Sequence, residues 1–166
     1  AKYEVGEALS FRLSDGLRAV LPQEAGDVVL AGMGGELILR IVGETPWLRD
    51  GAKRLVLQPM SSVAELRRGL AELGFQVLQE QAVVDGGKVY SAFSAAYQGA
   101  PVENGPLYPY LGKLIPGAPH VEDYARKVLR GLEAQRQGAL HQGDSQRAAQ
   151  LEELLSQIGQ AYLPQA

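Results

Sequence analysis

Apolar residues in the first part of the chain recur with two different periods. The short apolar run Val28–Ala31 leads into the glycine cluster Gly32–Gly35, and apolar residues at helical spacing follow within Glu36–Val42. A short apolar run bounded by turn residues predicts a strand buried on both faces, as in a parallel sheet. Ligands bind open α/β sheets at the carboxyl ends of such strands, so the glycine turn is the first candidate site.

The same order is repeated further along the chain. Leu55–Leu57 predicts a second short buried strand, which we expect to end at Gln58-Pro59 because proline has no amide hydrogen to give to a sheet. Ser61 or Ser62 is placed to cap the next helix, and Glu65 is its capping-box partner if Ser62 is the N-cap. The two units predict neighbouring strands, each followed by a helix.

Two stretches depart from this strand–helix order. Phe75–Val84 and Lys88–Tyr97 are extended runs, and Asp85-Gly86-Gly87 between them predicts a hairpin turn. Nearer the beginning, Leu9–Leu13 alternates apolar and polar residues, which predicts a strand that ends in a turn at Ser14–Leu17. The predicted sheet is therefore mixed, with parallel strands that give way to an antiparallel hairpin.

The end of the chain predicts a pair of helices. Residues 99–119 are rich in glycine, proline and tyrosine and predict an irregular linker. In the final helix, apolar residues are spaced alternately three and four apart, as in a coiled-coil seam, at Ala148, Leu151, Leu155, Ile158 and Tyr162. A rougher seam precedes it at Val121, Tyr124, Val128 and Leu132. We predict an α/β part over residues 1–98 and an antiparallel helical hairpin over residues 120–166.

Composition narrows the class of protein. The chain has 166 residues, of which 46% are hydrophobic, with no cysteine and a formal net charge of −3. It therefore has no disulfide framework and no thiolate metal site, and no apolar run approaches the roughly 20 residues that span a bilayer. His120 and His141 have no ligand partners at metal spacing, so we predict no metal site. We expect a cytoplasmic protein without a membrane segment, and its charge does not by itself indicate nucleic acid.

Four motifs in order give the chain a family resemblance. They are Asp15-Gly16-Leu17, Val28–Gly35, Leu55–Pro59 and Asp85–Tyr90. They resemble the bacterial tRNA (adenine(22)-N1)-methyltransferase family over roughly Tyr3–Tyr97, and the helical hairpin is similar to that family's coiled-coil domain. The resemblance implies an α/β fold: a partial Rossmann-like class I methyltransferase sheet that ends in an antiparallel hairpin, plus a C-terminal helical hairpin. It also implies an enzyme that transfers a methyl group from S-adenosylmethionine to N1 of an adenine in tRNA.

The resemblance further assigns roles to residues. It implies a cofactor-binding set of Asp15, Gly16, Leu17, Ala31 and Gly32. It implies a methyl-transfer set of Gly32, Met33, Gly34, Gln58 and Pro59. In these roles the Asp15 carboxylate accepts a hydrogen bond from the cofactor's adenine, and Gln58 bonds a base edge. Adenine N1 already carries a lone pair, so such a site orients the base and needs no activated nucleophile. Met60 stands where the family commonly has asparagine.

The resemblance also implies motifs for which residues 1–166 hold no counterpart. These are a first strand with a glycine-rich loop and a second strand with an acidic residue for the cofactor ribose. We therefore expect this chain to supply about half of the cofactor cradle. The strand Val28–Ala31 would then lack a neighbour, so we expect its edge to be covered by Leu9–Leu13 or by another chain, as in a homodimer formed through this edge or the coiled coil.

Simpler interpretations accompany these roles. Asp15-Gly16 is good turn chemistry in itself, and a glycine cluster also serves tight packing. Candidate cations for phosphate contact are interleaved with acids, which is typical of ordinary surface charge; they are Arg40, Arg49, Lys53, Arg54, Arg67 and Arg68. The alternative function is a non-catalytic methyltransferase fold that binds RNA or dimerises. A weaker alternative is a small-molecule methyltransferase, which would not need the helical hairpin.

Overall fold

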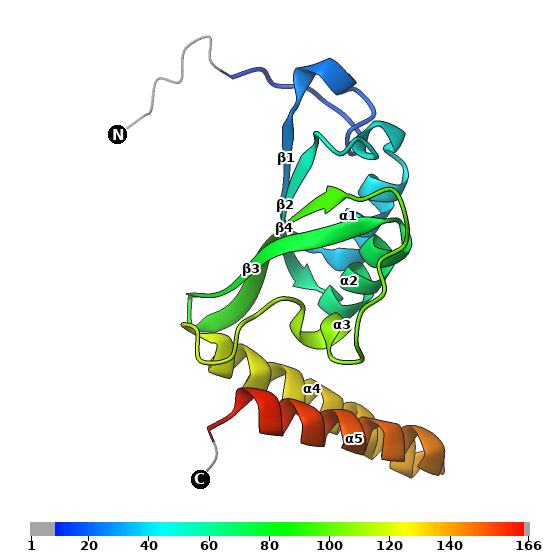
Figure 1. Ribbon diagram of the computed structural model, residues 1–166, viewed down its shortest axis with the longest axis vertical. Coiled ribbons are helices and arrows are strands. Elements are labelled where there is room, and N and C mark those ends of the chain that lie inside the picture. The colour runs from blue at the N-terminus through cyan, green and yellow to red at the C-terminus, as the bar shows by residue number, and fades with distance from the viewer. Residues whose placement is uncertain (1–8, 165–166) are drawn as a thin grey trace.

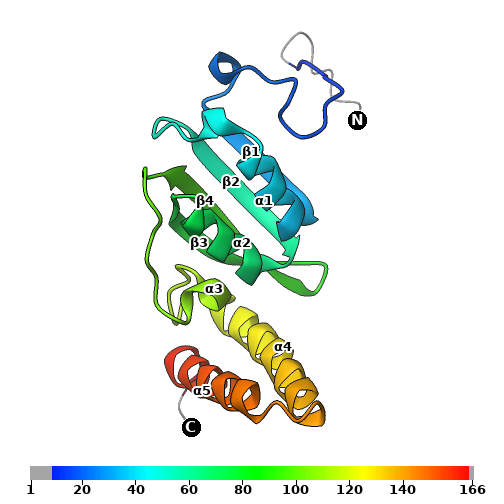
Figure 2. The same cartoon turned by 90° about the vertical axis from the view of Figure 1, so that its right-hand side faces the viewer.

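The computed structural model describes residues 9–164. A four-stranded sheet lies with α1 and α2 against one face, and the pair α4–α5 lies beyond one end of it (Figures 1 and 2). The elements in chain order are η2 (Pro22–Glu24), β1 (Asp27–Gly34), α1 (Gly35–Gly43), η3 (Pro46–Leu48), β2 (Arg54–Ser61), α2 (Val63–Glu72), β3 (Phe75–Asp85), β4 (Lys88–Tyr97), α3 (Tyr108–Leu111), α4 (Val121–His141) and α5 (Ser145–Tyr162).

The sheet is mixed, as the sequence predicts. Its strand order is β1-β2-β4-β3; β1 and β2 are parallel, and β4 is antiparallel to both β2 and β3. The predicted end of β2 at Gln58-Pro59 is wrong, because the strand continues to Ser61. Proline is tolerated there because β4 pairs with β2 only as far as Leu57, so Pro59 has a strand neighbour on one side alone.

The prediction that β1 is buried on both faces is also wrong. Val28 is 6% exposed, whereas Val29 is 66% exposed, so burial alternates along the strand. The reason is that α1 and α2 cover the same face of the sheet (Figure 2). Among residues 9–164, β1 pairs with β2 alone and is an edge strand.

The predicted strand at Leu9–Leu13 does not form and does not cover the edge of β1. Phe11 is 90% exposed, and the segment has no regular structure. Arg12 instead bonds the carboxylate of Glu24 at 2.8 Å and the carbonyl of Ala19 at 2.6 Å, which folds the segment back on its own neighbours. The expectation of a homodimer stays a prediction.

The start of α2 differs from the predicted capping box. Ser62 is the N-cap but has a left-handed backbone (φ 50°), and its side chain makes no capping bond. Its hydroxyl donates to Glu36 at 3.2 Å, while Glu65 forms an ion pair with Arg68. Ser62 therefore links the beginning of α2 to the first turn of α1.

The helical hairpin forms as predicted. Ala148, Leu151 and Ile158 of the α5 seam are buried, and the Asp144 side chain caps α5 by accepting a hydrogen bond from the Arg147 amide at 2.9 Å. The predicted linker differs in one respect, because it contains the one-turn helix α3. Within the described part of the chain, no helix has both the length and the apolar character needed to cross a membrane.

Two apolar clusters are joined by one buried polar network. The first lies between the sheet and α1–α2, and the second lies between Ala82, the α3 region and α4–α5. Arg67 of α2 lies between them, ion-paired with Glu80 and donating to the carbonyl of Pro109 at 2.8 Å. Its guanidinium also contacts the hydroxyls of Ser91 at 3.2 Å and Tyr124 at 3.3 Å. This network attaches the helical hairpin to the sheet.

Candidate functional site

The carboxyl ends of the parallel strands β1 and β2 meet at one edge of the sheet. In the β1–β2 register the pairing skips from Ala31 to Met33, so Gly32 is the extra residue of a bulge. Gly32 has φ +73°, which favours glycine, and its amide donates to the side-chain Oε1 of Gln58 at 2.9 Å. The structure therefore brings together the predicted Gly32 and Gln58 through a direct hydrogen bond.

The glycines of this turn serve different purposes. A Cβ on Gly32 would meet nothing within 4 Å, whereas a Cβ on Gly35 would collide with the backbone oxygens of Ser61 and Ser62. Gly34 pairs with Ser61 in the sheet. Gly35 is thus required by close packing of α1 on the β2–α2 junction, while Gly32 leaves open space where a ligand can approach.

The residues that follow along β2 complete this edge. Gln58 is half-buried, Pro59 is buried and Met60 is exposed. The Nε2 of Gln58 donates two weak hydrogen bonds, a long one to the Pro59 carbonyl at 3.5 Å and one to the Met60 sulfur at 3.5 Å, because a thioether is a weak acceptor. Gln58 therefore retains donor capacity on Nε2 and a second lone pair on Oε1.

The predicted cofactor set divides into two groups that do not meet. Ala31 and Gly32 lie at the carboxyl end of β1, but Asp15, Gly16 and Leu17 belong to the segment at the amino end of that strand (Figure 1). Asp15 is ion-paired with Arg40 and Arg18, each at 3.2 Å. A hydrogen bond from Arg40, with the charges of Arg40 and Arg18, lowers the pKa of Asp15. A cofactor role for Asp15 stays a prediction.

The sheet edge at the carboxyl ends of β1 and β2 can act by positioning a substrate. Residues 31–35 carry no titratable side chain, and Glu36 beside them is bonded to the Ser62 hydroxyl. The exposed backbone at Ala31 and Gly32 fits close approach by a cofactor at the strand ends. With Gln58 fixed by Gly32, the arrangement can orient a planar base against that position.

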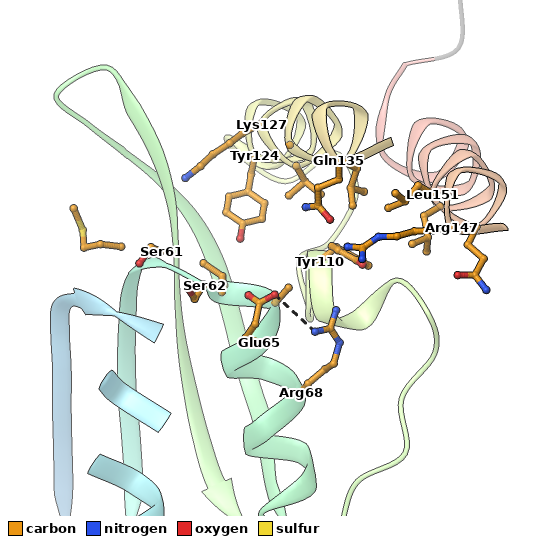
Figure 3. A pocket seen from close by; sticks show the side chains of 18 residues that line it. Ser61, Ser62, Glu65, Arg68, Tyr110, Tyr124, Lys127, Gln135, Arg147 and Leu151 are labelled. Carbon is orange, nitrogen blue, oxygen red and sulfur yellow. Dashed lines mark ion pairs between the residues drawn. The ribbon is translucent and has the colours of Figure 1, made fainter. Parts of the chain in front are cut away.

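The sequence does not predict the cavity that adjoins this edge. Figure 3 shows Tyr124 and Lys127 of α4 pointing toward Ser61 and Ser62, with Tyr110 and Arg147 further along. These side chains come from distant parts of the chain. Helical periodicity places Tyr124 in a seam but carries no signal for which part of the sheet that helix meets.

Four of the cations expected at phosphate contacts form ion pairs within the protein, and Lys53 donates to the carbonyls of Pro22 and Ala25. Arg40 pairs with Asp15 and Glu44, Arg54 pairs with Asp27, Arg67 is buried with Glu80, and Arg68 pairs with Glu65. These ion pairs favour the simpler interpretation, ordinary surface charge, for Arg40, Arg54 and Arg68, and a phosphate contact by any of them stays a prediction. Arg67 is a structural residue.

Comparisons with known proteins identify a family and a fold. The model of the family described as "Methyltransferase domain" matches residues 1–93. A comparison with curated proteins finds no match. Among solved structures, an uncharacterised protein from Listeria monocytogenes has TM-score 0.73 and 20% identity, covering 89% of this chain and 68% of its own.

Two further structures carry functional titles. The B. subtilis M1A22 tRNA methyltransferase TrmK has TM-score 0.68 and 22% identity, covering 89% of this chain and 68% of its own. A putative tRNA (m1A22) methyltransferase from Streptococcus pneumoniae, in complex with S-adenosyl-L-methionine, has TM-score 0.65 and 24% identity. The match covers 87% of this chain and 67% of the Streptococcus pneumoniae chain. The chain thus spans about two thirds of the length of these structures. This chain belongs to the methyltransferase domain family and has the fold of the solved tRNA (m1A22) methyltransferases.

Proposed function

We propose that this protein takes part in methyl transfer from S-adenosylmethionine to N1 of an adenine in tRNA. Membership of the methyltransferase domain family supports the reaction type and the cofactor. The likeness in fold to tRNA methyltransferases supports tRNA as the substrate class. The observation that carries the proposal is the hydrogen bond from the Gly32 amide to Gln58, because it fixes at the open strand edge an amide side chain that is able to bond a base.

The methyl-transfer step does not require a general acid or base from the protein. Adenine N1 forms the new bond to the methyl carbon with its own lone pair, and the carbon–sulfur bond breaks with its electrons left on sulfur. The positive charge moves from sulfur to the base, so no proton leaves in this step. A turn without titratable side chains, as in residues 31–35, suits this chemistry.

The cofactor supplies an electrophilic methyl group when it is bound. Ala31 and Gly32 would hold its reacting end through their exposed backbone. N1 lies on the Watson–Crick edge of adenine, so the target base must be unpaired when it reacts.

Gln58 is suited to reading adenine from the opposite edge. A glutamine can bond adenine through N7 and N6 together. In this pose Nε2 donates to N7, while the second lone pair of Oε1 accepts from the N6 amine and the first remains with Gly32. N1 is left free for methylation. Guanine presents an acceptor instead of the N6 amine, so this arrangement discriminates against it.

Because we expect this chain to supply about half of the cofactor cradle, the test is methyl transfer to an unmodified tRNA transcript by a purified protein that also contains the two strands implied for the other half. Nucleoside digestion and mass spectrometry identify the product, and calorimetry measures cofactor binding separately. We expect 1-methyladenosine. Methylation of another atom, or no transfer to tRNA by a protein that binds the cofactor, would contradict the proposal.

A further inference from the structure

Two cavities adjoin beside the candidate site. One of about 510 Å³ lies between the start of α2 and the pair α4–α5, and the other, of about 680 Å³, lies between the β3–β4 turn and α4. Met60 and Lys127 line both cavities. We call the two together the basic groove. Met60 follows Gln58 and Pro59 on β2, so the groove begins at the edge where the methyl transfer is proposed.

Six cations line this groove, and four of them have no carboxylate partner within the described residues. Among residues 9–164, Lys88, Lys127, Arg130 and Arg147 form no ion pair with a carboxylate, whereas Arg68 pairs with Glu65 and Arg126 pairs with Glu122. The acids that line the groove are Asp123 and Glu65, and Glu65 is already paired with Arg68. The protein as a whole carries net charge −3, so this local excess of cations is not a reflection of its composition.

Lys127 lies at the junction of the two cavities and is held in one place. Its Nζ donates to the Val89 carbonyl at 2.8 Å and lies over the rings of Tyr90 at 5.3 Å and Tyr124 at 5.8 Å. Partial burial lowers the pKa of this amine, since no carboxylate offsets its desolvation. An anion in the groove would supply the missing counter-charge.

We propose that the basic groove holds the sugar–phosphate backbone of RNA beside the target adenosine, with Lys127 and Arg147 at phosphate groups. Phosphate contacts position a nucleic acid, and aromatic side chains such as Tyr110 give neighbouring bases a surface to stack on. Figure 3 shows Arg147 and Tyr110 on the same side of the first cavity. The inference rests on the proposed function for the identity of the base, whereas the groove binds RNA whether or not methylation occurs.

The experiment measures binding of an unmodified tRNA transcript by fluorescence anisotropy at several salt concentrations. Lys127→Met and Arg147→Ala each remove one phosphate contact. We expect each substitution to weaken tRNA binding about fivefold at about 0.15 M salt. Each should also reduce the slope of log affinity against log salt concentration by about one. Lys127→Arg keeps the charge and is expected to retain most of the affinity.

The matched control is Lys113→Met. The Lys113 side chain is exposed, forms no ion pair within the described residues and lines neither cavity of the groove, so the control makes the same substitution outside the groove. We expect it to leave affinity and slope unchanged. Equal losses in Lys113→Met and Lys127→Met, or no tRNA binding by the unaltered protein, would contradict the proposal.

Different results would contradict the proposed groove and the proposed function. A protein that methylates adenine while its tRNA affinity is insensitive to Lys127 and Arg147 contradicts the groove alone. A protein whose tRNA binding depends on these residues, but which binds the cofactor and methylates no adenine, contradicts the proposed function alone.

Discussion

Arg67 and Glu80 form an ion pair in which both side chains are completely buried. The two residues are 13 apart in sequence, and the pair lies where α2, β3 and α4 meet. Glu80 also accepts a hydrogen bond from the Lys113 amide at 2.8 Å. Removing one member of such a pair leaves the other charge buried without compensation, which is far more costly than losing an exposed pair.

Arg67→Met is therefore expected to lower the free energy of unfolding by about 3–5 kcal/mol. Arg54→Ala, which breaks the exposed pair with Asp27, is the control and should cost at most about 1 kcal/mol. Urea unfolding followed by circular dichroism measures both. The double variant Arg67→Met/Glu80→Leu should recover much of the loss, because no charge is left buried; equal costs for Arg67→Met and Arg54→Ala would refute the assignment.

Gly35→Ala is expected to destabilise the protein by about 1–3 kcal/mol, because the new methyl group meets backbone oxygens of Ser61 and Ser62 that cannot move aside. Gly131→Ala is the matched substitution, since a Cβ there meets nothing within 4 Å inside α4. It should stabilise by about 0.5–1 kcal/mol. Thermal unfolding of the two variants gives the comparison, and a neutral Gly35→Ala would show that the junction is looser than described.

Gln58→Glu keeps an acceptor for the Gly32 amide but removes the donor that would meet adenine N7. We expect methylation efficiency (kcat/KM) to fall about ten- to a hundredfold, with cofactor affinity unchanged. A tRNA with 7-deazaadenosine at the target should lower the efficiency of the unaltered protein by a similar factor. The Gln58→Glu protein should not distinguish the two tRNAs; if it does, Gln58 is not the group at N7.

The helical hairpin has a pH-sensitive contact. Arg136 bonds Glu133 at 2.9 Å and reaches Glu152 of α5 at 3.0 Å, and its hydrogen bond, with that of Gln137, lowers the pKa of Glu133 to about 2. A lowered carboxyl pKa contributes stability that is present above the ordinary value of 4.5 and is lost as pH falls through about 2. Glu133→Gln should therefore melt with a weaker pH dependence in that range. Carbon-13 NMR titration of Glu133 checks the pKa directly, and a value near 4.5 would contradict the contact.

The parts of the fold that could be predicted from the sequence are those that local chemistry decides. The turn at Gly86 and Gly87 has φ +53° and φ +73°, which the Asp-Gly-Gly sequence indicates without knowledge of its surroundings. The contact between Gly32 and Gln58 could also be predicted from the sequence, because the ends of adjacent parallel strands share one edge of a sheet.

The parts that could not be predicted depend on a partner elsewhere in the chain. Leu9–Leu13 has the alternation of a strand, but a strand forms only where another pairs with it, and Arg12 bonds Glu24 instead. Tyr124 contacts Arg67 across 57 residues of sequence. No local pattern indicates which face of α4 meets the sheet. The sequence therefore does not predict the basic groove.

The β3–β4 hairpin extends well beyond the sheet that anchors it. Strand β2 pairs with β4 only at Phe93–Ala96, so the outer part of the hairpin is a two-stranded ribbon, which is marginally stable in water on its own. Its support comes from α4, through burial of Ala82 and the bond from Lys127 to Val89. Amide hydrogen exchange in the ribbon should therefore report local separation of the ribbon from α4 rather than global unfolding. One wall of the basic groove is then a unit that opens separately. We expect its amides to become protected from exchange when RNA is bound.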